Sequence, residues 1–104
     1  MTKALAAGAA LALTSLFTMP VVPAAEDGKP LFERKCAMCH GKDGVAKPMA
    51  KGSGNFNDPK WQGANPAETI EKVISGGKEK MKGYKDQLTP EQIRALAAYI
   101  KTLG

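Results

Sequence analysis

The sequence predicts an all-α domain with three main helices, and two observations lead to that prediction. Apolar residues recur at helical spacing in three segments, within residues 27–41, 65–77 and 89–103. Two of these segments also begin with residue types that cap helices. No run alternates apolar and polar residues as a half-buried strand does, and no internal repeat is visible.

The N-terminal quarter of the chain differs from the rest. Lys3 carries a positive charge, residues 4–17 are mostly Ala and Leu, and small or compact residues lead up to Ala24. This order is typical of a secretory signal peptide, and an apolar core of roughly 14–16 residues is short for a membrane anchor, which needs about 20. We therefore expect cleavage near Ala24 or Ala25.

We expect residues 1–24 to be the signal peptide and residues 25–104 to be one exported domain. About 80 residues bury only a marginal core, and such domains often need a disulfide, a metal or another cross-link. The chain has two cysteines, so it can form one disulfide at most. A large cofactor would supply the missing core.

The last helix has the clearest start. Thr89 is a good N-cap, Pro90 suits the first helical position, and Gln92 completes a capping box with Thr89. The apolar residues of this helix share one face: Ile93, Leu96, Ala97, Ile100 and Leu103.

The middle helix follows the same pattern. Asn65 is the expected cap, Pro66 the first residue and Glu68 the partner in the capping box. Gly76 and Gly77 should end the helix, because glycine readily adopts the left-handed conformation found there.

The first helix is expected over residues 27–41, with Phe32 and Cys36 on one side. Residues 41–64 are rich in Gly, Lys, Pro and Asn and show little periodicity. So long a loop is unusual in a small domain. A loop that folds over a cofactor would explain it.

Both cysteines and the only histidine lie within five positions, at Cys36, Cys39 and His40. A zinc site needs four ligands, and no further Cys or His exists. A thioredoxin-like dithiol begins a helix after a strand, which this pattern does not predict. A disulfide across a two-residue gap would remove little chain entropy and would leave His40 unexplained.

Haem attachment uses all three residues. Cys36 and Cys39 lie on one helical face, where both thiols can add to the vinyl groups of a haem, and His40 then lies under the iron. C-x-x-C-H is the attachment signature of c-type haem. This interpretation is favoured over the other three.

A methionine is the expected second axial ligand of the iron, as in electron carriers with His/Met ligation. Met38 lies between the cysteines and points away from the iron. Met49 follows His40 too closely to reach the other haem face easily. Met81 stands in a charged segment without apolar neighbours at core spacing, which suggests a ligand rather than a core residue. We expect Met81, with Met49 or an open position as alternatives.

Residues 25–104 resemble the small bacterial class I monohaem cytochromes c over nearly their whole length. The matching segments are GKPLFERKCAMCHG, NPAETIEKVISGG, KEKMKGYKDQLT and PEQIRALAAYIKTLG. The resemblance implies the class I cytochrome c fold, with three main helices and connecting loops wrapped around one covalently bound haem c and its iron. It also implies that the first and last helices cross, with Gly28 and Phe32 against Leu96 and Tyr99.

Three further residues are implicated by the resemblance. The family often holds the second nitrogen of the histidine with a loop proline carbonyl, for which Pro48 is the candidate. Some members donate a tryptophan N–H to a haem propionate, as Trp61 could. Many members have proline directly after the ligand methionine, where this chain has Lys82, and its loss should loosen the loop.

The resemblance implies a soluble exported monohaem cytochrome that carries single electrons in the periplasm and is not an enzyme. Its partners would be a redox donor and an acceptor with acidic docking surfaces, because seven lysines flank the haem motif and the methionine: Lys42, Lys47, Lys51, Lys78, Lys80, Lys82 and Lys85. We expect a monomer without nucleic acid and without stable membrane insertion after signal removal. The alternatives are a haem enzyme or gas sensor with an open distal site, and the haem subunit of a fixed complex.

Overall fold

The computed structural model describes residues 25–104, and the expected signal peptide lies outside the described residues. The helices, in order, are α1 (Ala25–Lys35), α2 (Ala37–His40), the short 3-10 helix η1 (Pro48–Ala50), α3 (Pro59–Ala64), α4 (Ala67–Gly76) and α5 (Pro90–Lys101). Over the described residues the only β-type pairing is a single bridge between Lys78 and Met81. The all-α prediction is confirmed.

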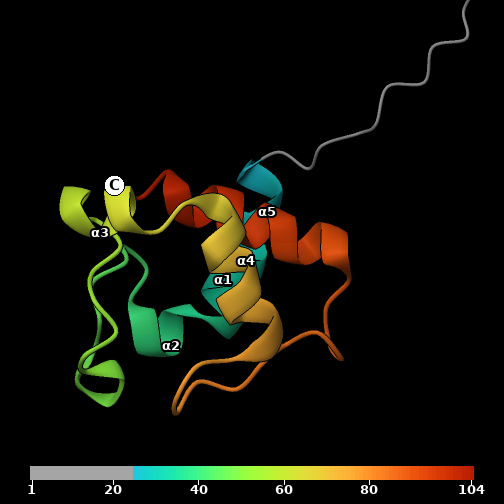
Figure 1. Ribbon diagram of the computed structural model, residues 1–104, viewed down its shortest axis with the longest axis horizontal. Coiled ribbons are helices and arrows are strands. Elements are labelled where there is room, and N and C mark those ends of the chain that lie inside the picture. The colour runs from blue at the N-terminus through green and yellow to red at the C-terminus, as the bar shows by residue number, and fades with distance from the viewer. Residues whose placement is uncertain (1–24) are drawn as a thin grey trace, which may run out of the picture.

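The first and last long helices, α1 and α5, cross and form the centre of the core (Figure 1). A Cβ atom on Gly28 would collide with the backbone carbonyl of Ala95, so only glycine allows this close approach. The Phe32 ring lies 5.3 Å from the Tyr99 ring, and the side chain of Leu96 is completely buried. These contacts confirm the predicted crossing.

The helix α5 begins as predicted. The backbone N–H of Gln92 donates to the hydroxyl oxygen of Thr89 at 3.1 Å, and the backbone N–H of Thr89 donates to the side-chain oxygen of Gln92 at 2.9 Å. This capping box satisfies two donors that would otherwise lack partners at the helix start.

The start of α4 differs from the prediction. The helix begins at Ala67, with Pro66 as N-cap and no side-chain cap. The side-chain amide of Asn65 instead donates to the carbonyl of Trp61 at 2.9 Å and so closes the end of α3. The predicted end is confirmed, because α4 stops at Gly76 and Gly77 has φ 83°.

The prediction from the sequence omits α3, which lies within the span expected to be a loop. Asp58 caps this helix by accepting from the backbone N–H of Lys60 at 2.9 Å, directly before Pro59. The Nζ of Lys101 on α5 donates to the carbonyls of Gln62 (2.7 Å) and Asn65 (3.1 Å) at the other end of α3. Contacts with α5 therefore fix the position of α3.

The expected first helix is divided at Cys36, where φ is −117° and ψ is −33°. The hydrogen-bond pattern nevertheless continues across this residue. Its N–H donates to the carbonyl of Phe32 at 2.9 Å, and its carbonyl accepts from the N–H of His40 at 2.9 Å. The division is thus a kink, and α1 holds α2 in place.

No helix within residues 25–104 is long and apolar enough to cross a bilayer.

Candidate haem site

A cavity of about 860 Å³, counted with its open mouth, lies between α2, α4 and the segments on either side of them. Much of its wall is apolar, from Phe56, Ile70, Val73, Ile74 and Ile100. Such a wall suits a large apolar cofactor.

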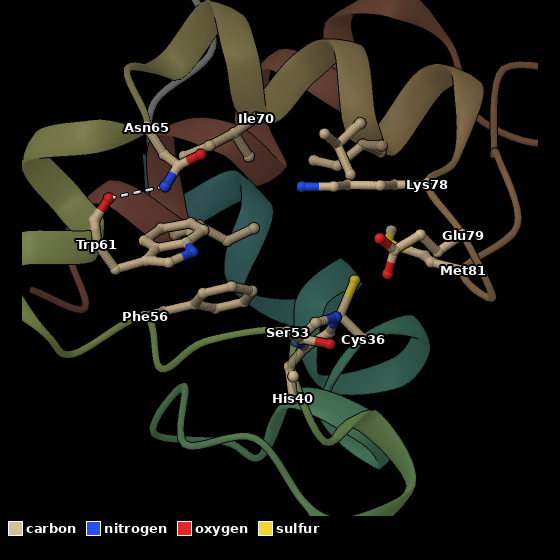
Figure 2. A pocket seen from close by; sticks show the side chains of 14 residues that line it. Cys36, His40, Ser53, Phe56, Trp61, Asn65, Ile70, Lys78, Glu79 and Met81 are labelled. Atoms are coloured by element: carbon tan, nitrogen blue, oxygen red, sulfur yellow. Dashed lines mark hydrogen bonds between the residues drawn. The ribbon is translucent and has the colours of Figure 1, made fainter.

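The cavity brings together three of the four predicted site residues. Cys36, His40 and Met81 line it (Figure 2), whereas Cys39 is half-buried and is not part of the lining. Figure 2 shows the sulfur of Cys36 directed into the cavity. Both cysteines are free thiols, and no cluster of three or more His, Cys, Asp or Glu residues suited to a metal ion occurs within residues 25–104.

The thiol of Cys36 is poorly suited to thiolate chemistry. Burial raises the pKa of this thiol to about 11, although the charge of Lys35 acts in the opposite direction. The thiol is therefore protonated at neutral pH, and the thiolate is the reactive form in redox dithiols. This environment weighs against the dithiol alternative.

The imidazole of His40 is a neutral ligand candidate, because burial lowers its pKa below the usual value. Its Nδ1 is buried and has no hydrogen-bond partner within the described residues. The expected bond from His40 to the carbonyl of Pro48 is absent. That carbonyl instead accepts from the backbone N–H of Lys51 at 3.2 Å, within the tight turn of η1.

Aromatic rings form one side of the cavity. The Phe56 ring stacks on the imidazole of His40, with ring centres 4.6 Å apart and planes 24° apart. The ring of Trp61 also lies beside Phe56, with ring centres 4.5 Å apart. No local pattern pointed to Phe56, because it lies in a segment without periodicity.

Met81 reaches the cavity from a tight turn after α4. Two hydrogen bonds close the turn, from Lys78 N–H to the Met81 carbonyl (3.0 Å) and from Met81 N–H to the Lys78 carbonyl (2.9 Å). Neither of the other described methionines lines the cavity, since Met38 and Met49 are 69% and 64% exposed. Among residues 25–104, Met81 is thus the methionine placed to act as a ligand.

Comparison with known proteins agrees with this geometry. The family described as "Cytochrome C oxidase, cbb3-type, subunit III" matches residues 23–100. The chain belongs to this cytochrome c family.

Individual relatives support the assignment. The chain is 35% identical over 83 residues to the cbb3-type cytochrome c oxidase subunit FixP of Azorhizobium caulinodans, covering 79% of this chain and 28% of that protein. It is 38% identical over 82 residues to subunit CcoP of Rubrivivax gelatinosus, covering 78% of this chain and 26% of that protein. The chain therefore spans little more than a quarter of the length of these curated relatives.

A solved structure has a similar fold over almost its full length. The c-type cytochrome KustC0563 matches with a TM-score of 0.68 and 33% identity, over 73% of this chain and 95% of that one. The predicted resemblance to a small class I-type monohaem cytochrome c is thus confirmed. The chain is a haem-binding electron-transfer protein, and its cofactor is covalently bound haem c with iron.

The residues around the cavity fit this cofactor. Apolar walls, the inward thiol of Cys36, the imidazole of His40 and the thioether of Met81 are groups that fit a c-type haem.

Proposed function

We propose that Cys36 and Cys39 attach the haem, that His40 and Met81 are its axial ligands, and that the chain carries single electrons between larger redox proteins. The observation that carries the proposal is the convergence of Cys36, His40 and Met81 on one largely apolar cavity in a member of a cytochrome c family.

The haem supplies a reversible one-electron change at its iron. The protein's residues set the conditions for that change. The lowered pKa of His40 keeps its nitrogen lone pair free at neutral pH, and a methionine thioether raises the reduction potential. The isoleucines of α4 and α5 line the cavity and keep water away from the haem, which reduces the solvent rearrangement that accompanies each electron transfer.

The rival function, a haem enzyme or gas sensor, requires an open distal position. Visible absorption of the holoprotein distinguishes the two. If Met81 binds the iron, wild-type protein should show the weak far-red band of a sulfur-to-ferric-iron bond. We expect Met81→Ala to lose this band and Met49→Ala to keep it. Wild-type protein that lacks the band and binds carbon monoxide readily would support the rival.

The lysines beside the cavity support a redox partner with an acidic docking surface. The side chains of Lys78, Lys80 and Lys82 are exposed around Met81. Positive charge at such a surface speeds encounter with an acidic partner, and the effect weakens as salt screens it. We expect the rate of electron transfer to a partner to fall with ionic strength, and a rate independent of salt would exclude this role.

The curated relatives are subunits of cbb3-type oxidases, which favours a second candidate setting. In that setting the domain is a haem subunit of a fixed complex rather than a free periplasmic carrier. Fractionation of native cells decides between them. A free monomer elutes alone from the periplasmic fraction, whereas a subunit remains with an oxidase in the membrane fraction.

A further inference from the structure

The large apolar side chains that are exposed within residues 25–104 all lie in one short stretch of the chain. They are Met38, Val45 and Met49, with 69%, 38% and 64% of their surface exposed. Single exposed apolar side chains are common on soluble proteins, whereas a group of them marks an interaction site. We call these three residues the α2–η1 patch, because they lie on α2, on η1 and on the loop between them.

Backbone hydrogen bonds hold the patch together at the edge of the molecule. The N–H of Lys47 donates to the carbonyl of Cys39 at 2.8 Å, which fixes the start of η1 beside α2. In the loop between them, the N–H of Gly44 donates to the carbonyl of Gly41 at 3.1 Å, directly before Val45. Figure 1 shows α2 away from the crossing of α1 and α5. The patch is therefore a fixed surface of the domain.

Positive charge surrounds the patch. Lys42, Lys47 and Lys51 are exposed in the same stretch, and Asp43 is the only carboxylate between positions 38 and 51. An oxygen of Asp43 accepts from the backbone N–H of Val45 at 3.1 Å. Protein interfaces have a centre enriched in methionine and a polar rim, and the charges of two partners are complementary. A surface of this kind fits a partner with an apolar centre and an acidic rim.

The turn that carries Met81 lacks the apolar half of this arrangement. It also has exposed lysines, but none of its large apolar residues, between positions 78 and 85, is exposed. Its lysines can attract an acidic partner from a distance. The α2–η1 patch is the surface with apolar groups for direct contact.

A membrane surface fits the patch less well than a protein does. Helices that lie in the membrane interface are amphipathic, with Trp, Phe or Leu on the apolar face. Here α2 has four residues and η1 has three, and the patch contains only methionine and valine.

We propose that the α2–η1 patch is the docking site for a redox protein whose contact surface has an apolar centre and an acidic rim. The inference rests on the proposed role of Cys39 as a point of haem attachment. Met38 directly precedes Cys39 in the chain. A partner bound at the patch therefore lies next to a covalently attached edge of the haem.

The test is an NMR titration of the reduced holoprotein with a reduced small blue-copper protein whose copper end is apolar and flanked by carboxylates. With both proteins reduced, no electron is transferred and neither metal broadens the spectrum. At low ionic strength we expect the backbone amide shifts to change mainly between positions 38 and 51.

The substitutions separate apolar contact from charge. Replacing both Met38 and Met49 by Gln should raise the Kd about tenfold, and most of this effect should persist when salt is added. Lys47→Gln should raise the Kd at low ionic strength only, because salt screens its charge. The matched control is Lys29→Gln, an exposed lysine of α1, which should bind like wild type.

The double variant should fold, because both methionines are exposed, and Met49→Gln alone repeats the test without a change between the cysteines. Four results would overturn the proposal: no binding, shift changes confined to positions 78–85, equal losses in Lys47→Gln and Lys29→Gln, and an unchanged Kd in both methionine variants. Binding to phosphatidylglycerol vesicles without binding to the copper protein would also overturn it, in favour of a membrane surface.

Failure of the proposed function looks different. Protein without covalently attached haem, or without the far-red band of Met81, contradicts the proposed roles of the site residues whatever the titration shows. Protein with a normal haem spectrum and no binding at the patch contradicts the docking site alone.

Discussion

The two sides of the cavity that carry the proposed iron ligands are built differently. His40 ends a helix that continues from α1 and packs against the buried ring of Phe56. Met81 belongs to a tight turn whose neighbours Lys80 and Lys82 are exposed. Local unfolding begins where buried contacts are few. We therefore expect the turn that carries Met81 to unfold locally before the segment that carries His40.

The turn with Met81 is attached mainly to α4. The backbone N–H groups of Tyr84 and Lys85 donate to the carbonyls of Ile74 (2.7 Å) and Ser75 (3.2 Å). Its one hydrogen bond to the histidine side is long, from the hydroxyl of Tyr84 to the carbonyl of Lys35 at 3.5 Å. The two sides can therefore be perturbed separately.

The largest expected effect is on the helix crossing that supports the histidine side. Gly28→Val should lower the free energy of unfolding by about 3 kcal/mol, because its side chain would collide with the backbone of α5. Denaturant unfolding of the holoprotein measures the change. The control is Gly63→Ala in α3, where a Cβ meets no atom within 4 Å. Equal losses in both variants would contradict a specific crossing.

A smaller effect is expected where α5 holds α3. Lys101→Met removes a charged donor that is bonded to two carbonyls of α3, and we expect a loss of about 1.5 kcal/mol in denaturant unfolding. Lys60→Met makes the same change at an exposed lysine of α3 and should cost less than about 0.5 kcal/mol. If both variants unfold like wild type, these bonds do not stabilise the domain.

On the methionine side, we expect one substitution to increase stability. Glu79 has φ 54°, a left-handed conformation that glycine adopts without strain. Glu79→Gly should stabilise the turn by about 0.5 kcal/mol after the larger chain entropy of glycine is subtracted. The denaturant concentration at which the far-red band disappears reports this local stability. Lys80→Gly, in the same turn but without positive φ, should lower it instead.

The smallest expected effect comes from the link between the two sides. Tyr84→Phe removes only the long bond to Lys35 and should cost less than about 0.5 kcal/mol at neutral pH. Partial burial raises the pKa of the Tyr84 phenol above its usual value of 10. The folded state therefore disfavours ionisation, and wild type should lose stability relative to the variant as the pH rises past 10. Unfolding curves of wild type and Tyr84→Phe at neutral and alkaline pH check this sign. The same pH dependence of stability in both proteins would contradict it.

The sequence predicted features that depend on neighbours along the chain. The capping box at Thr89 and the stop at Gly77 were confirmed because each needs only a few adjacent residues. The crossing at Gly28 was predicted instead from the resemblance to known cytochromes. That resemblance indicates which segments far apart in the sequence pack together.

The errors have a common physical cause. Asn65 suits an N-cap by type, but its amide closes the preceding helix, whose position depends on Lys101, far away in sequence. The bond expected from His40 to the carbonyl of Pro48 is absent, and that carbonyl accepts from the backbone N–H of Lys51 within the turn of η1. The position of Phe56 likewise depends on contacts between distant segments, which no local pattern reveals.

The crossing of α1 and α5 also sets an order for biogenesis. The core closes only when residues 25–35 meet residues 90–101, which lie far apart in the sequence. In the closed domain Cys36 is only 9% exposed, so an attachment enzyme could not reach its thiol. With Cys36 as an attachment point, haem ligation must therefore precede closure of the fold, and the cofactor enters as a template around which the helices assemble.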